Sequence, residues 1–527
     1  MSDEVRTSLI GGDEGDVSMF GGMSKDQVTM IFGTVGVGFI FILFGAVVPA
    51  LGIMIVGGGL GFLLTIPTAS GTLASKAITR LRWVWRRVRG TDRFEPYSDA
   101  KWETAQGRKE RIALRARPDG ADAMVWLQSG VGEPGIAWHR PLGEEEYLSV
   151  AFSVEGILQG LESQAEIEAS SEAWGNFLAG YGGGTSLVRE VQTITRVLPP
   201  DMAYHMQWLR QNLHPAEDND VPAGTMAVLR QSYAQVLDVC ERGALVQRHF
   251  VVLRWPISQA FTQQAAHFGA YHEGWLEMMH QEVDAALRAL AFSGMGAVSV
   301  LTARQTAAMM LHQQDPSRPL DKVSDVEPDV MAVSSHDVRG ACVTKGADRE
   351  YWHATAMIRS SLTGNAPRTT LWTLPVLTGM RAPIVRTMSF HLRLIPAMSA
   401  RGRAESDAAR AHVEVIEANK RGRLDSLEAQ HQRDTALRRM NDLRPGSRHQ
   451  GVEWVGFVTI TSESAEGLGR DKRIMEEHVQ TGLGINRLLW MDTMHSAAMG
   501  TTWPIARGVR PRRAALFDQA SAALDRA

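Results

Sequence analysis

The longest apolar stretch of the chain lies near its N-terminus, where no charged residue occurs between Asp26 and Lys76. A helix rises ~1.5 Å per residue, so a bilayer core of ~30 Å takes roughly 20 residues per crossing. The stretch is too long for one span and fits two. It predicts a transmembrane helical hairpin over residues 28–73 that turns at Pro49, preceded by a short N-terminal segment, 1–27.

A basic and aromatic run follows the hairpin. The run contains Trp83, Trp85, Arg86 and Arg87 among further arginines. Positive residues close to a span remain on the cytoplasmic side. The run therefore predicts that the body and both termini lie on the cytoplasmic side of the inner membrane. Beside a span, such a run favours an interfacial anchor that contacts membrane lipids over a nucleic-acid site. A signal peptide does not fit, because a second apolar run follows the first directly.

Beyond a basic exit and linker at 74–118, strand and helix periods alternate. The pattern predicts an α+β fold: two ferredoxin-like units with mostly antiparallel sheets, at 119–320 and 351–508, joined by a linker at 321–350 and followed by a tail at 509–527. Each unit reads as strand, helix, strand, helix. The expected strands are 147–154, 185–198, 245–255 and 297–301, then 351–359, 386–394, 452–461 and 486–491; the longer expected helices are 223–242, 258–291, 399–441 and 464–481.

Two segments of the second unit carry distinctive patterns. In 386–394, apolar and polar side chains alternate, which predicts a strand with one buried and one solvated face. The segment 399–441 is rich in charges of both signs at helical spacing, with a thin apolar stripe. It predicts one long helix, broken at most by Gly402 and Gly422, that projects or packs on a partner along a narrow seam.

Composition excludes several classes of function. The net charge of −3 argues against direct, sequence-specific nucleic-acid binding, because such domains are usually strongly basic. The two cysteines, Cys240 and Cys342, are too few for a disulfide scaffold or a cysteine metal site. Hydrophobic residues make up 44% of the chain, which is ordinary for a protein with folded cores.

Candidate catalytic and metal-binding patterns are weak. No lysine follows glycine in the arrangement of a P-loop, and no Gly-x-Ser-x-Gly motif occurs. His267, His272 and His280 are spaced by five and eight residues, which does not stack two imidazoles on one helix face. The contiguous Ser335, His336 and Asp337 read as a loop, since a working triad converges from separate segments. The sequence therefore predicts no catalytic, cofactor-binding or metal-binding residue and no cofactor.

The order of these parts resembles the membrane-bound conjugation proteins of actinobacteria. The resemblance rests on the glycine-rich hairpin, the basic Trp/Arg exit and the closing segment 452–508. The chain is similar to a small two-helix inner-membrane subunit of type IV secretion fused to the N-terminal, non-motor half of the large secretion ATPase. In that family a P-loop domain follows the segment that ends near Gly508, whereas this sequence ends at Ala527.

The resemblance implies a non-enzymatic membrane scaffold that docks a separate P-loop ATPase and other secretion subunits, with homo-oligomers possible. The 399–441 helix and the segment 502–527 are the expected contacts, with Trp503 and Phe517 as buried anchors. Two alternatives stay open: a two-span component of type VII secretion, and a membrane-tethered enzyme with an unrecognised site. The transported substrate, the oligomeric state and any small-ligand site are not specified by the sequence.

Overall fold

The computed structural model describes residues 71–508 apart from 142–144, 157–161, 213–223, 244, 322, 324–325, 338–339, 360–362, 364–367, 381, 421–426 and 445–448. Before residue 71 it describes only 7–8, 36, 39–45, 47–49, 52, 57, 59 and 67–68. Most of the expected hairpin and the whole tail 509–527 lie outside the described residues. Within the described part of the chain, no helix has the length and apolar character needed to cross a membrane.

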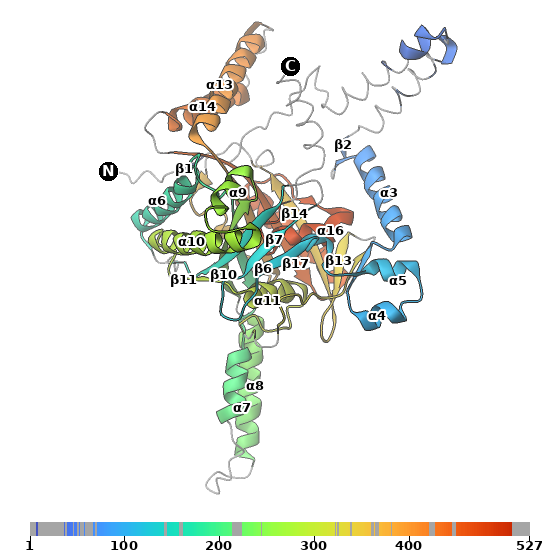
Figure 1. Cartoon of the computed structure of the whole chain (residues 1–527), viewed down its shortest axis with the longest axis vertical. Helices are drawn as coiled ribbons and strands as arrows, with labels where there is room; N and C mark the ends of the chain where they lie inside the picture. The colour runs from blue at the N-terminus through green and yellow to red at the C-terminus, as the bar shows by residue number, and fades with distance from the viewer. Residues whose placement is uncertain are drawn as a thin grey trace.

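One large, mostly antiparallel sheet of 14 strands forms the centre of the molecule (Figure 1). The main path runs β5-β4-β12-β13-β14-β17-β16-β9-β10-β8-β7-β6, with β11 beside β8 and β18 beside β14. The strands are β4 (Arg93–Pro96), β5 (Leu114–Arg115), β6 (Met124–Gln128), β7 (Ile136–His139), β8 (Tyr147–Val154), β9 (Glu190–Leu198), β10 (Val246–Pro256), β11 (Val298–Val300), β12 (Ser334–Asp337), β13 (Ala341–Lys345), β14 (Glu350–Arg359), β16 (Val385–Ile395), β17 (Gly451–Ser462) and β18 (Leu489–Trp490).

Helices connect these strands and cover the sheet. They are α3 (Leu73–Arg89), α4 (Asp99–Thr104), α5 (Arg108–Ala113), α6 (Gln164–Tyr181), α7 (Ala203–Asn212), α8 (Thr225–Gly243), α9 (Gln259–Ala265), α10 (Tyr271–Phe292), α11 (Ala303–Gln314), α12 (Leu374–Leu377), α13 (Ala397–Lys420), α14 (Leu427–Asp442), α15 (Ala465–Leu483) and α16 (His495–Ala498). The expected helix 258–291 is two helices, because Gly269 between α9 and α10 has a φ of +152°, which interrupts helical geometry.

The two halves of the chain repeat one strand order. In the first half, the sequence β8, β9, β10, β11 is arranged in space as β9-β10-β8-β11; in the second, β14, β16, β17, β18 is arranged as β16-β17-β14-β18. All these pairings are antiparallel. The hairpin β6–β7 flanks β8 just as β12–β13 flanks β14. The second repeat thus begins at β12, inside the range expected to be a linker, 321–350.

The repeats meet through equivalent strands. β9 pairs antiparallel with β16 over eight residue pairs, from Glu190 opposite Arg393 to Val197 opposite Arg386. Because the second strand of each repeat lies beside its counterpart, an approximate two-fold rotation relates the two halves. The sheets expected for two separate units are therefore one continuous sheet.

Each repeat carries a helical arm between its second and third strands. α7 and α8 leave the first repeat, and α13 and α14 leave the second; both arms project from the body in Figure 1. The sequence allowed a break at Gly422, and this residue lies among 421–426, which separate α13 from α14. The two helices pack against each other as a hairpin instead of forming a single projecting helix. Ala404 and Ala436 are buried in the arm, whereas Val413 of α13 stays exposed.

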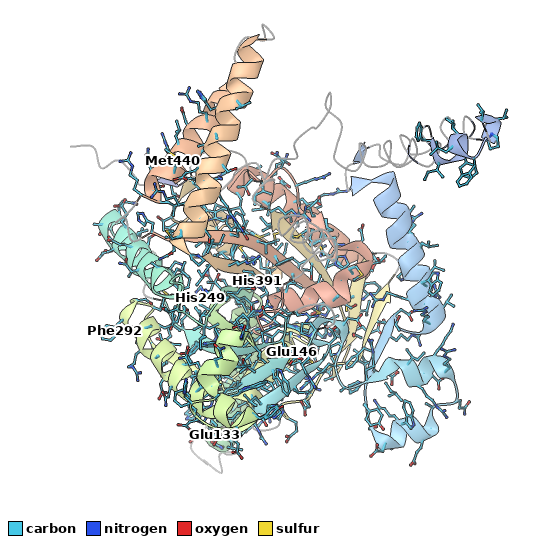
Figure 2. The ribbon with its side chains drawn as sticks, turned by 45° about the horizontal axis from the view of Figure 1, so that its top comes forward. Glu133, Glu146, His249, Phe292, His391 and Met440 are labelled. Atoms are coloured by element: carbon cyan, nitrogen blue, oxygen red, sulfur yellow. The ribbon has the colours of Figure 1, made fainter. Side chains whose placement is uncertain are left out.

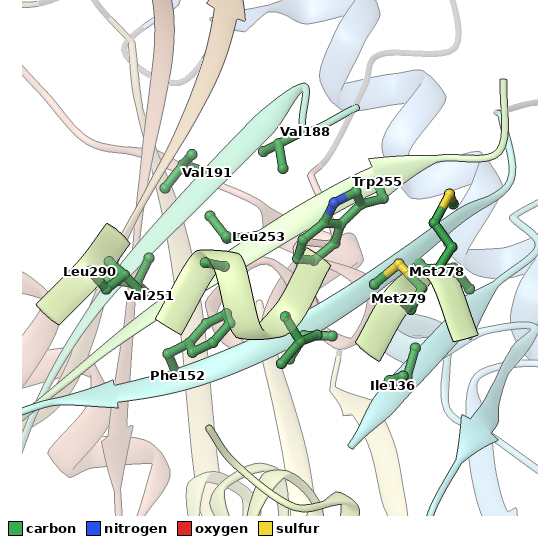
Figure 3. Close-up of a cluster of buried hydrophobic side chains, with 14 of the residues drawn as sticks. Ile136, Phe152, Val188, Val191, Val251, Leu253, Trp255, Met278, Met279 and Leu290 are labelled. Carbon is green, nitrogen blue, oxygen red and sulfur yellow. The ribbon is translucent and has the colours of Figure 1, made fainter. Parts of the chain in front are cut away.

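One face of the sheet is packed in the usual way for an α+β protein. In the first repeat, α6, α9 and α10 cover Phe152, Leu253 and Trp255 (Figure 3). In the second, α15 and α12 cover a corresponding cluster that includes Met388 and Val458. These two clusters account for most of the large aliphatic side chains in the interior.

The opposite face of the sheet is also buried, and the sheet curves around it so that this face is concave. Phe94 of β4 and Met124 of β6, from strands near the two ends of the sheet, share one cluster with Trp503. The strand 385–395 was expected to have a solvated polar face. Instead, Ser389 and His391 on that face are 0% and 3% exposed, because the segment after β18 and helix α11 fill the concave side.

Candidate membrane-facing helix and its connection to the core

The helix α3 has an apolar stripe that no described part of the chain covers. Leu81, Val84, Trp85 and Val88 are exposed, with Leu81 at 63% and Val88 at 65%. Their spacing of three, one and three residues places them on one helix face. Arginines flank this face on both sides, at positions 80, 87 and 89. Apolar residues bordered by arginines and tryptophan are typical of a helix that lies in the interface of a membrane.

The tryptophans of α3 carry arginines beside them. The guanidinium of Arg89 lies 4.3 Å from the ring centroid of Trp85, and that of Arg87 lies 5.2 Å from the ring centroid of Trp83. Both distances are in the range of cation–π contacts. The Trp85–Arg89 pair lies on the exposed stripe and presents an apolar ring and a cation together, which suits the boundary between acyl chains and headgroups. Trp83 lies on another side of the helix, with its indole nitrogen buried.

Arg86 faces the other way and ties α3 to the body. Its guanidinium donates to Asp119 and, at 3.4 Å, to Ser496 at the start of α16. Asp119 also accepts from Arg115 at 2.8 Å and from Ser496 at 3.0 Å. One carboxylate therefore joins helix α3, the segment that follows it and the C-terminal part of the chain.

The electrostatics of Asp119 follow from these partners. Burial by itself would raise the pKa of the carboxyl group, but the charges of Arg86 and Arg115, with hydrogen bonds from Arg115 and Ser496, hold that pKa below its ordinary value. The carboxylate is thus kept ionised. A neutral side chain at this position would leave two guanidinium groups without their acceptor.

The segment after β18 is fastened to the seam between the repeats by Gln192. The amide nitrogen of Gln192 donates to Ser389 Oγ at 2.9 Å and to the carbonyl oxygens of Thr501 and Trp503 at 3.0 Å each. Its amide oxygen accepts from the backbone N–H of Ala506 at 2.8 Å. A single buried side chain thus holds three points of the C-terminal segment.

A second set of buried polar contacts crosses the same seam. His391, which Figure 2 labels within the body, lies 2.8 Å from Glu190 through Nδ1 and 2.9 Å from the Thr501 carbonyl oxygen through Nε2. The two ring nitrogens thus reach two acceptors, one on β9 and one in the C-terminal segment. Glu190 accepts in addition from Arg254 at 3.0 Å.

Three other buried histidines, His353, His139 and His312, are kept neutral by burial. Burial lowers the pKa of His353 to about 3, and its ring bridges Thr344 and Thr461 at 2.7 and 2.9 Å. Burial also places the pKa values of His139 and His312 well below the ordinary value, with nearby arginines adding to the effect. The polar interior is therefore a structural hydrogen-bond network that fastens α11 and the C-terminal segment to the sheet.

Trp503 does not lie where a partner-binding anchor must. Its side chain is 1% exposed, and a Cβ added at Gly120 would come within 2.9 Å of the ring. The ring packs inside the chain, so the expected role as a docking anchor is corrected to one in the core. Phe517, the other expected anchor, lies outside the described residues. Pro49, the expected turn of the hairpin, is described as exposed, but most of the surrounding span is not described.

The histidines and the Ser-His-Asp run that the sequence offered as weak candidates for chemistry lie in packing contacts and in a strand. His272 packs edge-on against Trp138 and Trp275, and His280 lies 2.6 Å from the Gln128 side-chain oxygen. No group of three or more His, Cys, Asp or Glu side chains suited to a metal ion occurs among the residues that the structure describes. Residues 335–337, expected to be a loop, belong to strand β12.

Sequence reasoning missed Asp119, Gln192 and Glu190. Asp119 gave no signal, because two of its three partners, Arg86 and Ser496, lie far from it in the sequence. Gln192 and Glu190 gave a usable signal: they alternate with Val191 in a strand, so two polar side chains share a face with Ile194. Polar residues that share a strand face with large apolar residues can indicate a buried hydrogen-bond network.

Comparison with known proteins adds no relative: no family model matches the chain, and the search of curated proteins returns no match.

Proposed function

We propose that this protein is a membrane-anchored, non-catalytic scaffold of a type IV secretion or conjugation machine. The observation that carries the proposal is α3, whose exposed stripe at Leu81, Val84, Trp85 and Val88 lies on the side away from Arg86 and the core. Exposed apolar residues in this number on a single surface helix need a cover, and the apolar run before α3 makes a lipid interface the natural one.

The body attached to this helix suits a scaffold. Both repeats follow the β-α-β-β-α-β order of ferredoxin-like units, and the buried polar groups at their seam serve packing and hydrogen bonding. The charged α13–α14 arm and the tail 509–527 offer surfaces for a separate P-loop ATPase on the cytoplasmic side. This partner rests on the family resemblance, in which the non-motor half stands between membrane and motor.

The lipid contact is tested with spin labels in proteoliposomes. In a background with Cys240→Ser, a nitroxide on Val88→Cys is compared with one on Glu103→Cys, an exposed position of α4. We expect the label at 88 to be accessible to dissolved oxygen and shielded from a polar nickel reagent, with the opposite result at 103. Equal accessibility to the polar reagent at both positions would refute the membrane-facing role of α3.

The ATPase contact is tested by co-purification from detergent-solubilised membranes. A variant that lacks residues 397–442 and 509–527 should lose a P-loop ATPase that the complete chain retains. The matched control lacks the other arm, residues 203–243, and should keep the ATPase. Retention of the ATPase by the first variant contradicts the docking proposal and leaves the lipid contact of α3 unaffected.

A further inference from the structure

The α7–α8 arm exposes a continuous apolar surface far from α3. On α8, Val228, Leu229, Tyr233, Val236 and Val239 have exposed fractions from 40% to 67%. At 100° per residue these five positions fall within one side of the helix. Cys240 is exposed and continues the same side.

The neighbouring helix does not cover this surface. α7 reaches α8 through His205, which hydrogen-bonds to the Tyr233 hydroxyl group and has its ring centroid 5.9 Å from that of Tyr233. α7 adds its own exposed aromatic residues, Tyr204 at 58% and Trp208 at 56%, four positions apart on one face. The equivalent arm of the second repeat behaves differently, because α13 and α14 pack closely on each other.

The size of this surface matches what a stable dimer needs. The seven large apolar residues named above together expose on the order of 800 Å², which is about the area that one partner buries in an interface of standard size. Central aromatic residues of this kind usually contribute most of the binding energy at such interfaces.

Charge favours a like surface as the partner. The charged residues of α8 are Arg230, Asp238, Glu241 and Arg242, and at 100° per residue all four fall outside the side that carries the apolar residues; α7 contributes only Arg210. Two such surfaces can meet without strong repulsion and without burying unpaired carboxylates. A charged partner would find few counter-charges here.

We propose that the α7–α8 arm binds the same arm of a second copy of this chain, in a two-fold contact between the two apolar surfaces. The contact makes the scaffold a dimer through its first repeat and leaves the α13–α14 arm of the second repeat free. It is independent of the proposed lipid and ATPase contacts.

Cysteine crosslinking of the full-length chain in detergent tests the contact directly. Cys342 is 1% exposed in the core, so a short bismaleimide should react with Cys240 alone. We expect a crosslinked dimer whose yield does not fall when the protein is diluted with unrelated membrane protein. The Cys240→Ser variant should give none. The wild-type chain should also be crosslinked at a concentration where its measured mass is that of a dimer. Absence of a crosslink under that condition would place Cys240 away from the interface and overturn the proposal.

A charge substitution gives the second measurement. Val236→Glu places a carboxylate in the middle of the surface, and should weaken the dimer by about 100-fold, measured by analytical ultracentrifugation. Val131→Glu, at another exposed valine in the β6–β7 turn, is the matched control and should not change the mass. Both sites are exposed, so thermal unfolding measured at concentrations where all the chains are monomeric should be unchanged. A Val236→Glu chain that is as dimeric as the wild type, or one that only loses vesicle binding, refutes the proposal.

Discussion

Glu190 of the first repeat and His391 of the second are joined by a hydrogen bond of 2.8 Å between Glu190 Oε1 and His391 Nδ1. The other ring nitrogen of His391 contacts the carbonyl oxygen of Thr501. A single imidazole thus connects both halves of the sheet with the segment that closes its concave face. Gln192, which pairs opposite His391 in the β9–β16 ladder, fastens the same segment at three further points.

Replacing Gln192 by Ala should release the C-terminal segment. The change removes four hydrogen bonds and leaves the Thr501 and Trp503 carbonyl oxygens without this donor, at a cost of about 3 kcal/mol in the free energy of unfolding. Urea unfolding measures the loss, and limited proteolysis near residues 498–508 should become faster. Thr193→Ala, on the opposite face of the same strand, should cost less than about 1 kcal/mol. Equal losses of stability in the two variants would show that the hydrogen bonds of Gln192 do not stabilise the C-terminal segment.

Asp119→Asn should loosen α3 from the body. The amide cannot neutralise Arg86 and Arg115, so we expect a loss of about 2 kcal/mol in stability and faster proteolysis within residues 71–107. Because the native pKa of Asp119 is depressed, its contribution is present above the pKa of the unfolded chain and is lost as pH falls through the native value. Glu103→Gln, an exposed carboxylate, is the control. Unchanged proteolysis of Asp119→Asn at neutral pH would contradict this role.

Trp503→Ala should unfold the protein rather than release a partner. Removing a ring that is 1% exposed leaves a large cavity beside Phe94 and Met124, at a cost of about 3–5 kcal/mol. The exposed Trp85→Ala is the matched control and should change stability by no more than about 0.5 kcal/mol in detergent. Chemical denaturation of both variants decides between them. A fully stable Trp503→Ala chain would argue that the ring serves an external contact after all.

His353 predicts how stability depends on pH. Its native pKa of about 3 lies below the ordinary value of about 6.5, so the unfolded chain binds a proton in this window and the folded chain does not. The free energy of unfolding should therefore fall as pH decreases below about 6.5, by about 1.4 kcal/mol per pH unit for this residue. His353→Gln should reduce the measured slope by about that amount between pH 6 and pH 4.5.

The control for this prediction is His272→Gln, whose ring is exposed. Its slope should match that of the wild type. The buried His139 and His312 remain in both variants and keep part of the acid sensitivity. An unchanged slope in His353→Gln would mean that His353 is protonated in the folded chain.

Local pattern predicted strands well where the residues themselves determine the structure. The strand at 147–154 has the same bounds in the structure, and 386–394 differs from β16 by one residue at each end. In α15, Ser464 accepts from the backbone N–H of Gly467, which explains why the helix begins where the sequence indicates. These features depend on side chains within a few positions.

Other features depend on distant partners and left little local signal. β12 and β13 are short, and they are strands because β4 and β14 pair with them. The charges of 399–441 fit one solvated helix as well as two packed ones, so the hairpin could not be distinguished by periodicity. The burial of Trp503 follows from the curl of the sheet, which the segment Thr502 to Ala506 does not encode by itself.

The seam between the repeats has a consequence for synthesis on the ribosome. β9 borders β10 on one side, and its other edge is completed only by β16, about 200 residues later. From the end of β11 to the end of β16 the ribosome adds about 95 residues, so at 5–20 residues per second the complete first repeat exists for roughly 5–20 s with a long strand edge open to other chains. On that edge, Gln192 finds its partners Ser389, Thr501, Trp503 and Ala506 only in residues that are made later. Until then its amide disfavours pairing of the edge with a second nascent chain, so the side chain that fastens the mature seam also protects it while it is unfinished.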